Sequence, residues 1–182
     1  MLHPLIWIPS RWHTRAFIVL CALALGMLVI MRWVNQPLIS DAVPGGIIDF
    51  ELAASLDASL AIQVAWGEKG RMYAALGLGL DYLYLLLYAL ALSLACSRFA
   101  YWGEEQGRLS VAMSWVPIAA ALLDALENYA LARLLFGEVR EGWVIVARDC
   151  ALLKFALLAV VALYLLYAAA QMVKVRWRVF AG

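Results

Sequence analysis

Residues 111–136 read VAMSWVPIAAALLDALENYALARLLF, and this stretch decides the fold class of the chain. Its length and apolar character are those of a helix that crosses a membrane, which needs about 20 mostly apolar residues. Asp124, Glu127 and Asn128 interrupt the run at positions i, i+3 and i+4, so a helix places all three on one face. An ionised group at the centre of a bilayer costs at least about 2.5 kcal/mol. We therefore expect this polar face to point into a protein interior.

The composition of the whole chain predicts an integral membrane protein. Of its 182 residues, 66% are hydrophobic and only 15% are charged, which is too little polar surface for a soluble domain of this size. The formal net charge of +1 provides no basic field, so nucleic acid is not an expected partner. Both histidines precede the first apolar run, and the three cysteines form no CxxC pair. We therefore predict no metal site, no cofactor and no disulfide framework.

Four apolar runs predict an all-α bundle of four transmembrane helices in a single membrane domain, residues 1–182. The spans are expected at about 16–34, 72–97, 111–136 and 148–173. Tryptophans flank the runs and none lies in the middle of one, as expected for aromatic side chains at the two membrane interfaces. The first run could instead be a signal peptide, because Ser40-Asp41-Ala42 resembles a cleavage site, but we interpret it as a retained helix. The fourth helix is expected to begin between Trp143 and Cys150.

The connection between the first two runs predicts one further helix, at about residues 47–66. Its leucine and valine side chains recur at steps of four, which indicates an amphipathic helix lying at the membrane interface: Leu52, Leu56, Leu60 and Val64. The same segment carries Asp49, Glu51, Asp57 and Gln63 and is too polar to span comfortably. Its three acids are expected to form the solvated face of that helix.

Ionisable side chains in three different runs predict one intramembrane polar site. Asp81 and Glu127 each lie roughly 14–15 Å from the end of their run, at 1.5 Å per residue. Lys154 reaches the same depth if its helix begins at Trp143, and lies only one turn deep if it begins at Cys150. Three acids facing one base would leave two unpaired charges in a low dielectric, so at least one carboxyl is expected to be protonated at neutral pH.

This site predicts acid–base chemistry without a metal on a lipid or another amphiphile. One protonated carboxyl would serve as general acid and one ionised carboxyl as base, in an isomerisation, hydration or hydrolysis. The candidate catalytic residues are Asp124, Glu127, Asp81 and Lys154. The candidate substrate-binding residues are Asn128, Tyr84 and Tyr88, with Asn128 orienting the ligand. Whether the chain is an enzyme stays open at this point.

Two other functions fit the same residues. A lysine–carboxylate pair can simply join helices in a membrane, which would make the protein a non-catalytic accessory or assembly subunit of a larger complex. Buried carboxyls also mark proton and cation pathways, although four helices would need a homo-oligomer to form one. The expected partners are therefore membrane lipids, a lipidic ligand, and further copies or subunits within the membrane.

Several motifs together resemble a family of bacterial four-helix membrane proteins that has no established activity. The resemblance is carried by Phe50-Glu51, Trp66-Gly67-x-x-Gly70-Arg71, Asp81-x-x-Tyr84-x-x-x-Tyr88 and Leu123-Asp124-x-x-Glu127-Asn128, within residues 47–165. It implies the four-helix topology and a bacterial cytoplasmic (inner) membrane, but no mechanism. The basic residues near both ends of the chain favour an orientation with both termini in the cytoplasm.

Overall fold

The structure, a computed structural model, describes residues 4–98 and 104–180 and is all-α over these residues. Four long helices dominate it: α1 (His13–Asn35), α3 (Leu56–Ser97), α4 (Glu104–Leu135) and α5 (Glu141–Phe180). Three short elements complete the described chain: η1 (Ser10–Trp12), η2 (Gln36–Leu38) and α2 (Ile47–Glu51). The predicted all-α helical bundle is confirmed.

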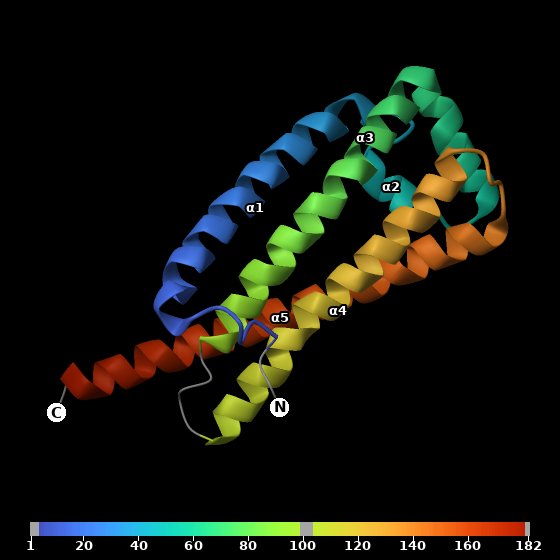
Figure 1. The fold of residues 1–182 in the computed structure, drawn as a ribbon. Coiled ribbons are helices and arrows are strands. Elements are labelled where there is room, and N and C mark those ends of the chain that lie inside the picture. The colour runs from blue at the N-terminus through green and yellow to red at the C-terminus, as the bar shows by residue number, and fades with distance from the viewer. Residues whose placement is uncertain (1–3, 99–103, 181–182) are drawn as a thin grey trace.

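The long helices lie in the order α1, α3, α4 and α5, with α3 packed between α1 and α4 and with α5 packed along α4 (Figure 1). Successive long helices run in alternating directions, so α1 begins and α5 ends at the same end of the bundle (Figure 1). The short helix α2 lies at the opposite end, where it contacts α3, α4 and α5. This placement brings the connection between α1 and α3 over the ends of the other helices.

Within the described residues, four helical segments are long and apolar enough to cross a membrane, the first of them covering α1 and η2: His13–Leu38, Leu56–Ser97, Gly107–Leu135 and Glu141–Val173. The chain is thus a multi-pass membrane protein. Many large apolar side chains of α1 are exposed, including Val29 and Leu25, and lipid would cover this face. The fourth helix begins at Glu141, before both starts expected from the sequence. Helix α4 begins at Glu104, ahead of the span expected at about 111–136.

The prediction of one continuous interfacial helix at residues 47–66 is wrong. Helix α2 ends at Glu51, and Ser55 begins a new helix by accepting a hydrogen bond from the backbone N–H of Ala58 at 3.2 Å. That new helix continues past residue 66 into α3, interrupted only at Gly67, where φ is 61° and ψ is −168°. Glycine tolerates this conformation because it lacks a Cβ atom. Figure 1 shows that α3 changes direction sharply within its length.

Only part of the expected apolar stripe of this segment faces the protein, since Leu56 packs against the core while the stripe ends in an exposed valine. Val64 is 81% exposed, whereas Ser59, Gln63 and Trp66 are buried against the bundle. In a membrane the lipid accommodates leucine and valine as well as a protein core does, so the inward face of a helix is free to carry small or polar residues. The stripe therefore did not identify the buried face of the helix.

Local hydrogen bonds fix the short helix α2. The side-chain oxygen of Asn35, at the end of α1, accepts a hydrogen bond from the backbone N–H of Ile47 at 2.9 Å. Gly46 turns the chain with φ of 62°, and a Cβ atom there would lie only 2.6 Å from the Asn35 side chain. Asp49 accepts a hydrogen bond from the N–H of Gly45 at 2.8 Å. These contacts set the position from which Glu51 projects.

Two aromatic residues anchor α2 to the main bundle. Phe50 is almost completely buried and packs edge-on against Trp66, with ring centroids 5.3 Å apart. The indole N–H of Trp66 donates a hydrogen bond to the backbone carbonyl of Leu38 at 2.9 Å. Trp66, which the sequence places at a membrane interface, thus lies in the apolar core. Its position ties the end of α1, α2 and the first part of α3 together.

Candidate functional site

Lys154 of α5 is the centre of a buried cluster of charged side chains. Its Nζ atom lies 2.8 Å from Asp124 Oδ1 and 2.8 Å from Glu127 Oε2, both on α4. The three side chains are nearly or fully inaccessible, with 6%, 3% and 0% exposure in that order. Buried charges of this kind are retained in proteins when they are paired, because an unpaired buried charge is very costly. The early start of α5 gives Lys154 the depth that this pairing requires.

Asp124 is the most completely paired acid of the cluster. Its Oδ1 atom accepts a hydrogen bond from Lys154, and its Oδ2 atom accepts one from the hydroxyl of Tyr88 on α3 at 2.9 Å. Glu127 is different, because its Oε1 atom has no hydrogen-bond partner among the described residues. The carboxylate of Asp124 thus links α4 to both α5 and α3.

A second polar pair lies beside this cluster. The amide nitrogen of Asn128, on α4, donates a hydrogen bond to Asp81 Oδ2, on α3, at 2.5 Å. Asn128 is 2% exposed, whereas Asp81 is partly exposed. No direct contact joins Asp81 to Lys154 in the described structure. The expected polar site thus divides into a lysine cluster and a neighbouring amide–carboxylate pair.

Tyr84, a candidate substrate-binding residue from the sequence, makes fewer polar contacts than Tyr88. Its ring packs against the ring of Tyr88, with centroids 5.4 Å apart and planes at 61°. Among the described residues, its hydroxyl makes no hydrogen bond, in contrast to that of Tyr88. Tyr84 therefore supports Tyr88 by packing.

Glu51 is the member of the site that sequence reasoning missed. The expectation that it lies on a solvated helix face is wrong, because the residue is only 9% exposed and its Oε2 atom lies 3.8 Å from Lys154 Nζ. Burial raises the pKa of the Glu51 carboxyl above its ordinary value, and the Lys154 ammonium opposes this rise. Glu51 belongs to the Phe50-Glu51 pair of the family resemblance, which was the one sequence signal available for it.

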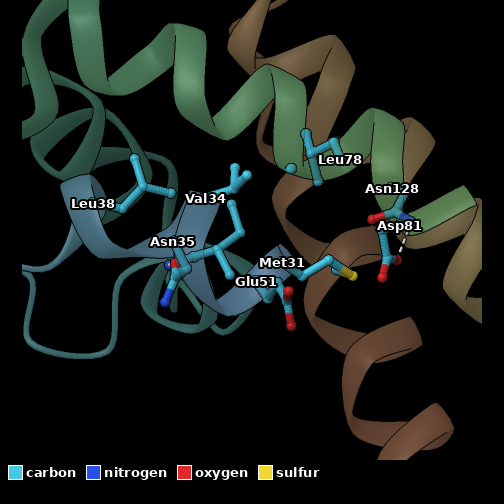
Figure 2. A pocket seen from close by; sticks show the side chains of 10 residues that line it. Met31, Val34, Asn35, Leu38, Glu51, Leu78, Asp81 and Asn128 are labelled. Atoms are coloured by element: carbon cyan, nitrogen blue, oxygen red, sulfur yellow. Dashed lines mark hydrogen bonds between the residues drawn. The ribbon is translucent and has the colours of Figure 1, made fainter. Parts of the chain in front are cut away.

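A small cavity lies between α1, α2 and α3 beside these acids (Figure 2). Its volume is about 40 Å³, which is room for roughly three water molecules. Polar groups from four elements line one part of it, and apolar side chains line the rest. The lining residues are Met31, Val34, Asn35, Leu38, Ile47, Glu51, Gly77, Leu78, Asp81 and Asn128. Asp124, Glu127 and Lys154 do not line the cavity.

The site carries more negative charge than the sequence predicted. Three carboxyl groups, those of Glu51, Asp124 and Glu127, surround Lys154, and a fourth, that of Asp81, lies beside them on Asn128. If every group were ionised, the formal charge would be −3, which is highly unfavourable at this burial. Bound protons or a bound cation must offset part of it. Within the part of the chain that the structure describes, no group of three or more His, Cys, Asp and Glu side chains is arranged to hold a metal ion.

Comparison with known proteins adds no relative of this chain. No protein-family model, no curated protein and no solved structure matches it. The chemistry of the site therefore has to be derived from its own geometry.

Proposed function

We propose that this multi-pass membrane protein binds a lipid or another amphiphile in the cavity between α1 and α3 and acts on its head group by acid–base chemistry. The observation that carries the proposal is the two-sided lining of the cavity. Glu51, Asp81 and Asn128 offer polar groups, and Met31 and Val34 offer apolar contact. Ligand sites typically combine a mostly apolar wall with a few polar groups that fix the orientation of the ligand.

The geometry suggests separate roles for the acids. Asp81 and Glu51 line the cavity and are the groups that would exchange protons with a bound head group. Asn128 holds one oxygen of Asp81 and thereby orients its carboxylate. Asp124 and Glu127 do not line the cavity. They would act indirectly, because their ion pairs with Lys154 set the electrostatic potential near the cavity. Burial raises the pKa of the Glu51 carboxyl, so this group takes up a proton more readily than a solvated glutamate does, which suits acid–base chemistry.

A test of binding uses glycine substitutions that differ only in whether they fill the cavity. Gly77 lines the cavity, and a Cβ atom there would meet Val34 Cγ1 at 3.8 Å, whereas a Cβ atom on Gly79 would meet nothing within 4 Å. Mass spectrometry of lipids that co-purify with the protein should show an amphiphile that is lost in Gly77→Leu and kept in Gly79→Leu. Equal retention by both variants would exclude the cavity as the binding site.

A test of chemistry compares the membrane lipids of cells that express the wild type with those of cells that express Glu127→Gln. The substitution keeps the shape of the side chain and removes its charge from Lys154. We expect one lipid species to accumulate and another to decrease. The reason is that the loss of the Glu127 charge changes the electrostatic potential at the groups that would transfer protons, which slows the reaction. Unchanged lipid composition would argue against an enzyme.

A second candidate function is that of an assembly subunit in a membrane complex. The close packing of Lys154 against Asp124 and Glu127 favours it, because such pairs also hold helices together. Affinity purification of the intact protein from membranes distinguishes the two proposals. A stoichiometric partner that dissociates in Lys154→Met, with an unchanged lipid composition, would support the assembly role. By the motif resemblance we also propose a bacterial inner membrane location, and by the basic residues near both ends of the chain an orientation with both termini in the cytoplasm.

A further inference from the structure

We infer that the cavity between α1 and α3 selects an amphiphile whose head group is a primary ammonium. This inference rests on the proposed function, because it names the ligand class of the same cavity. It is carried by three observations on the residues that line or surround the cavity: an unpartnered carboxylate oxygen, an excess of negative charge, and the size of the space.

The unpartnered oxygen belongs to Glu51. Its Oε2 atom is buried and has no hydrogen-bond partner among the described residues, and the residue, which lines the cavity, is 9% exposed. Lys154, at 3.8 Å, is too distant to donate a hydrogen bond to it. A buried acceptor without a donor is unfavourable, so a donor group in the cavity would be favoured there. An ammonium offers three donors and no acceptor.

The negative charge around the cavity points to a cationic donor. Lys154 is already shared between Asp124 and Glu127, each at 2.8 Å, and has no short contact left for Glu51 or Asp81. Asn128 supplies one hydrogen bond to Asp81 but no positive charge. A cation between Glu51 and Asp81 would therefore offset charge that the protein itself leaves uncompensated. A neutral hydroxyl would satisfy the oxygen of Glu51 and leave the charge unchanged.

The size of the cavity restricts the form of that cation. A volume of about 40 Å³ fits a primary ammonium, which is close to the size of water, more readily than a bulkier trimethylammonium group. The apolar side of the cavity is formed by Met31, Val34 and Leu38 near the end of α1. An alkyl chain that follows these side chains would leave the cavity along α1, whose apolar surface is largely exposed. The ligand would thus enter sideways from the lipid.

The experiment measures thermal unfolding of the full chain in uncharged phosphatidylcholine nanodiscs. Four added compounds separate the elements of the inference: dodecylamine, dodecyltrimethylammonium, dodecanol and ethylamine. We expect dodecylamine to raise the unfolding temperature with half-maximal effect at about tenfold lower concentration than dodecanol or dodecyltrimethylammonium, since hydrogen bonds to charged groups are the stronger ones. Glu51→Gln should abolish this preference, whereas Glu68→Gln, at an exposed position, should retain it.

Each other result of the stabilisation experiment would overturn one part of the inference. Equal stabilisation by dodecylamine and dodecanol would overturn the ammonium inference and leave amphiphile binding standing. Equal stabilisation by ethylamine and dodecylamine would overturn the amphiphile and leave an ammonium site. No stabilisation by any compound would overturn both. If Glu51→Gln does not fold, Asp81→Asn carries the same expectation, with Asp149→Asn, at an exposed position, as its control.

Discussion

The carboxylate of Glu51 lies 3.8 Å from the ammonium of Lys154, although one residue ends the short helix α2 and the other lies well inside the transmembrane helix α5. This relationship joins the connection after α1 to the polar centre of the bundle. It adds a fourth carboxyl to a site whose single base already pairs with Asp124 and Glu127. The stability of the protein should therefore depend on how that charge is balanced.

Removal of the lysine should destabilise the protein strongly. In Lys154→Met, Asp124 and Glu127 lose their buried counter-charge, and loss of one partner from such a cluster costs about 3–5 kcal/mol. The free energy of unfolding in nanodiscs measures the loss. Lys69→Met, at an exposed position, is the control and should change little. Adding Glu127→Gln to Lys154→Met should restore part of the loss, and a further loss in the double variant would contradict the ion-pair interpretation.

The hydroxyl of Tyr88 should contribute more than that of Tyr84. Tyr88→Phe removes the hydrogen bond to Asp124 Oδ2 and should lower the free energy of unfolding by about 1–2 kcal/mol. Tyr84→Phe keeps the ring contact with Tyr88 and should change the free energy of unfolding by less. Both variants are compared by unfolding in the same nanodiscs. Equal losses would show that the hydrogen bond is not what Tyr88 supplies.

The bend at Gly67 should depend on glycine. Its φ of 61° and ψ of −168° lie in a region that other residues adopt only under strain, so Gly67→Ala should cost about 1–3 kcal/mol. Gly79 lies in a regular part of α3 and is also free of neighbours within 4 Å. Gly79→Ala should instead stabilise by roughly 0.5–1 kcal/mol. Unfolding measurements on both variants would contradict the assignment if their effects had the same sign.

The pH dependence of stability should reveal the raised pKa of Glu51. The folded protein binds a proton at Glu51 that the unfolded chain releases above the ordinary pKa of 4.5. Its contribution to stability is therefore complete below that pH and is lost as the pH rises through the folded pKa. Lys154 on α5 and Glu127 and Asp124 on α4 all face Glu51 and shape this dependence.

The measurement compares unfolding of the wild type and of Glu51→Gln between pH 4.5 and neutral pH. Because glutamine does not titrate, the wild type should lose stability relative to the variant as the pH rises. Glu68→Gln, which changes an exposed side chain, should follow the wild type. Parallel curves for the wild type and Glu51→Gln would rule out a raised pKa at this residue.

The excess of acids over base also predicts a protonated carboxyl at neutral pH. Infrared difference spectroscopy should detect the carbonyl stretching band of at least one such group, because four ionised carboxylates near one lysine are too costly to bury. Fully ionised acids at neutral pH would refute this, unless the purified protein retains a bound cation, which mass spectrometry would reveal.

Much of the architecture follows from the sequence because hydropathy reports directly on the lipid environment. The four apolar runs predicted four long helices, and the spacing of Asp124, Glu127 and Asn128 predicted one polar helix face. In the structure this face meets Lys154 and Asp81. In lipid a polar face has to point toward other polar groups, so the partners available to it are few.

Only the tertiary structure decided the place of Glu51 and the existence of the cavity. In sequence Glu51 is one of several acids in a polar segment, and Asp49 and Asp57 beside it have no contact with the lysine cluster in the described structure. The turn at Gly46, the packing of Phe50 on Trp66 and the bend at Gly67 together set where Glu51 projects. Such contacts between distant segments have no periodicity that a sequence could reveal. Most residues of the site could thus be predicted from nearby positions in the sequence, whereas their arrangement in space could not.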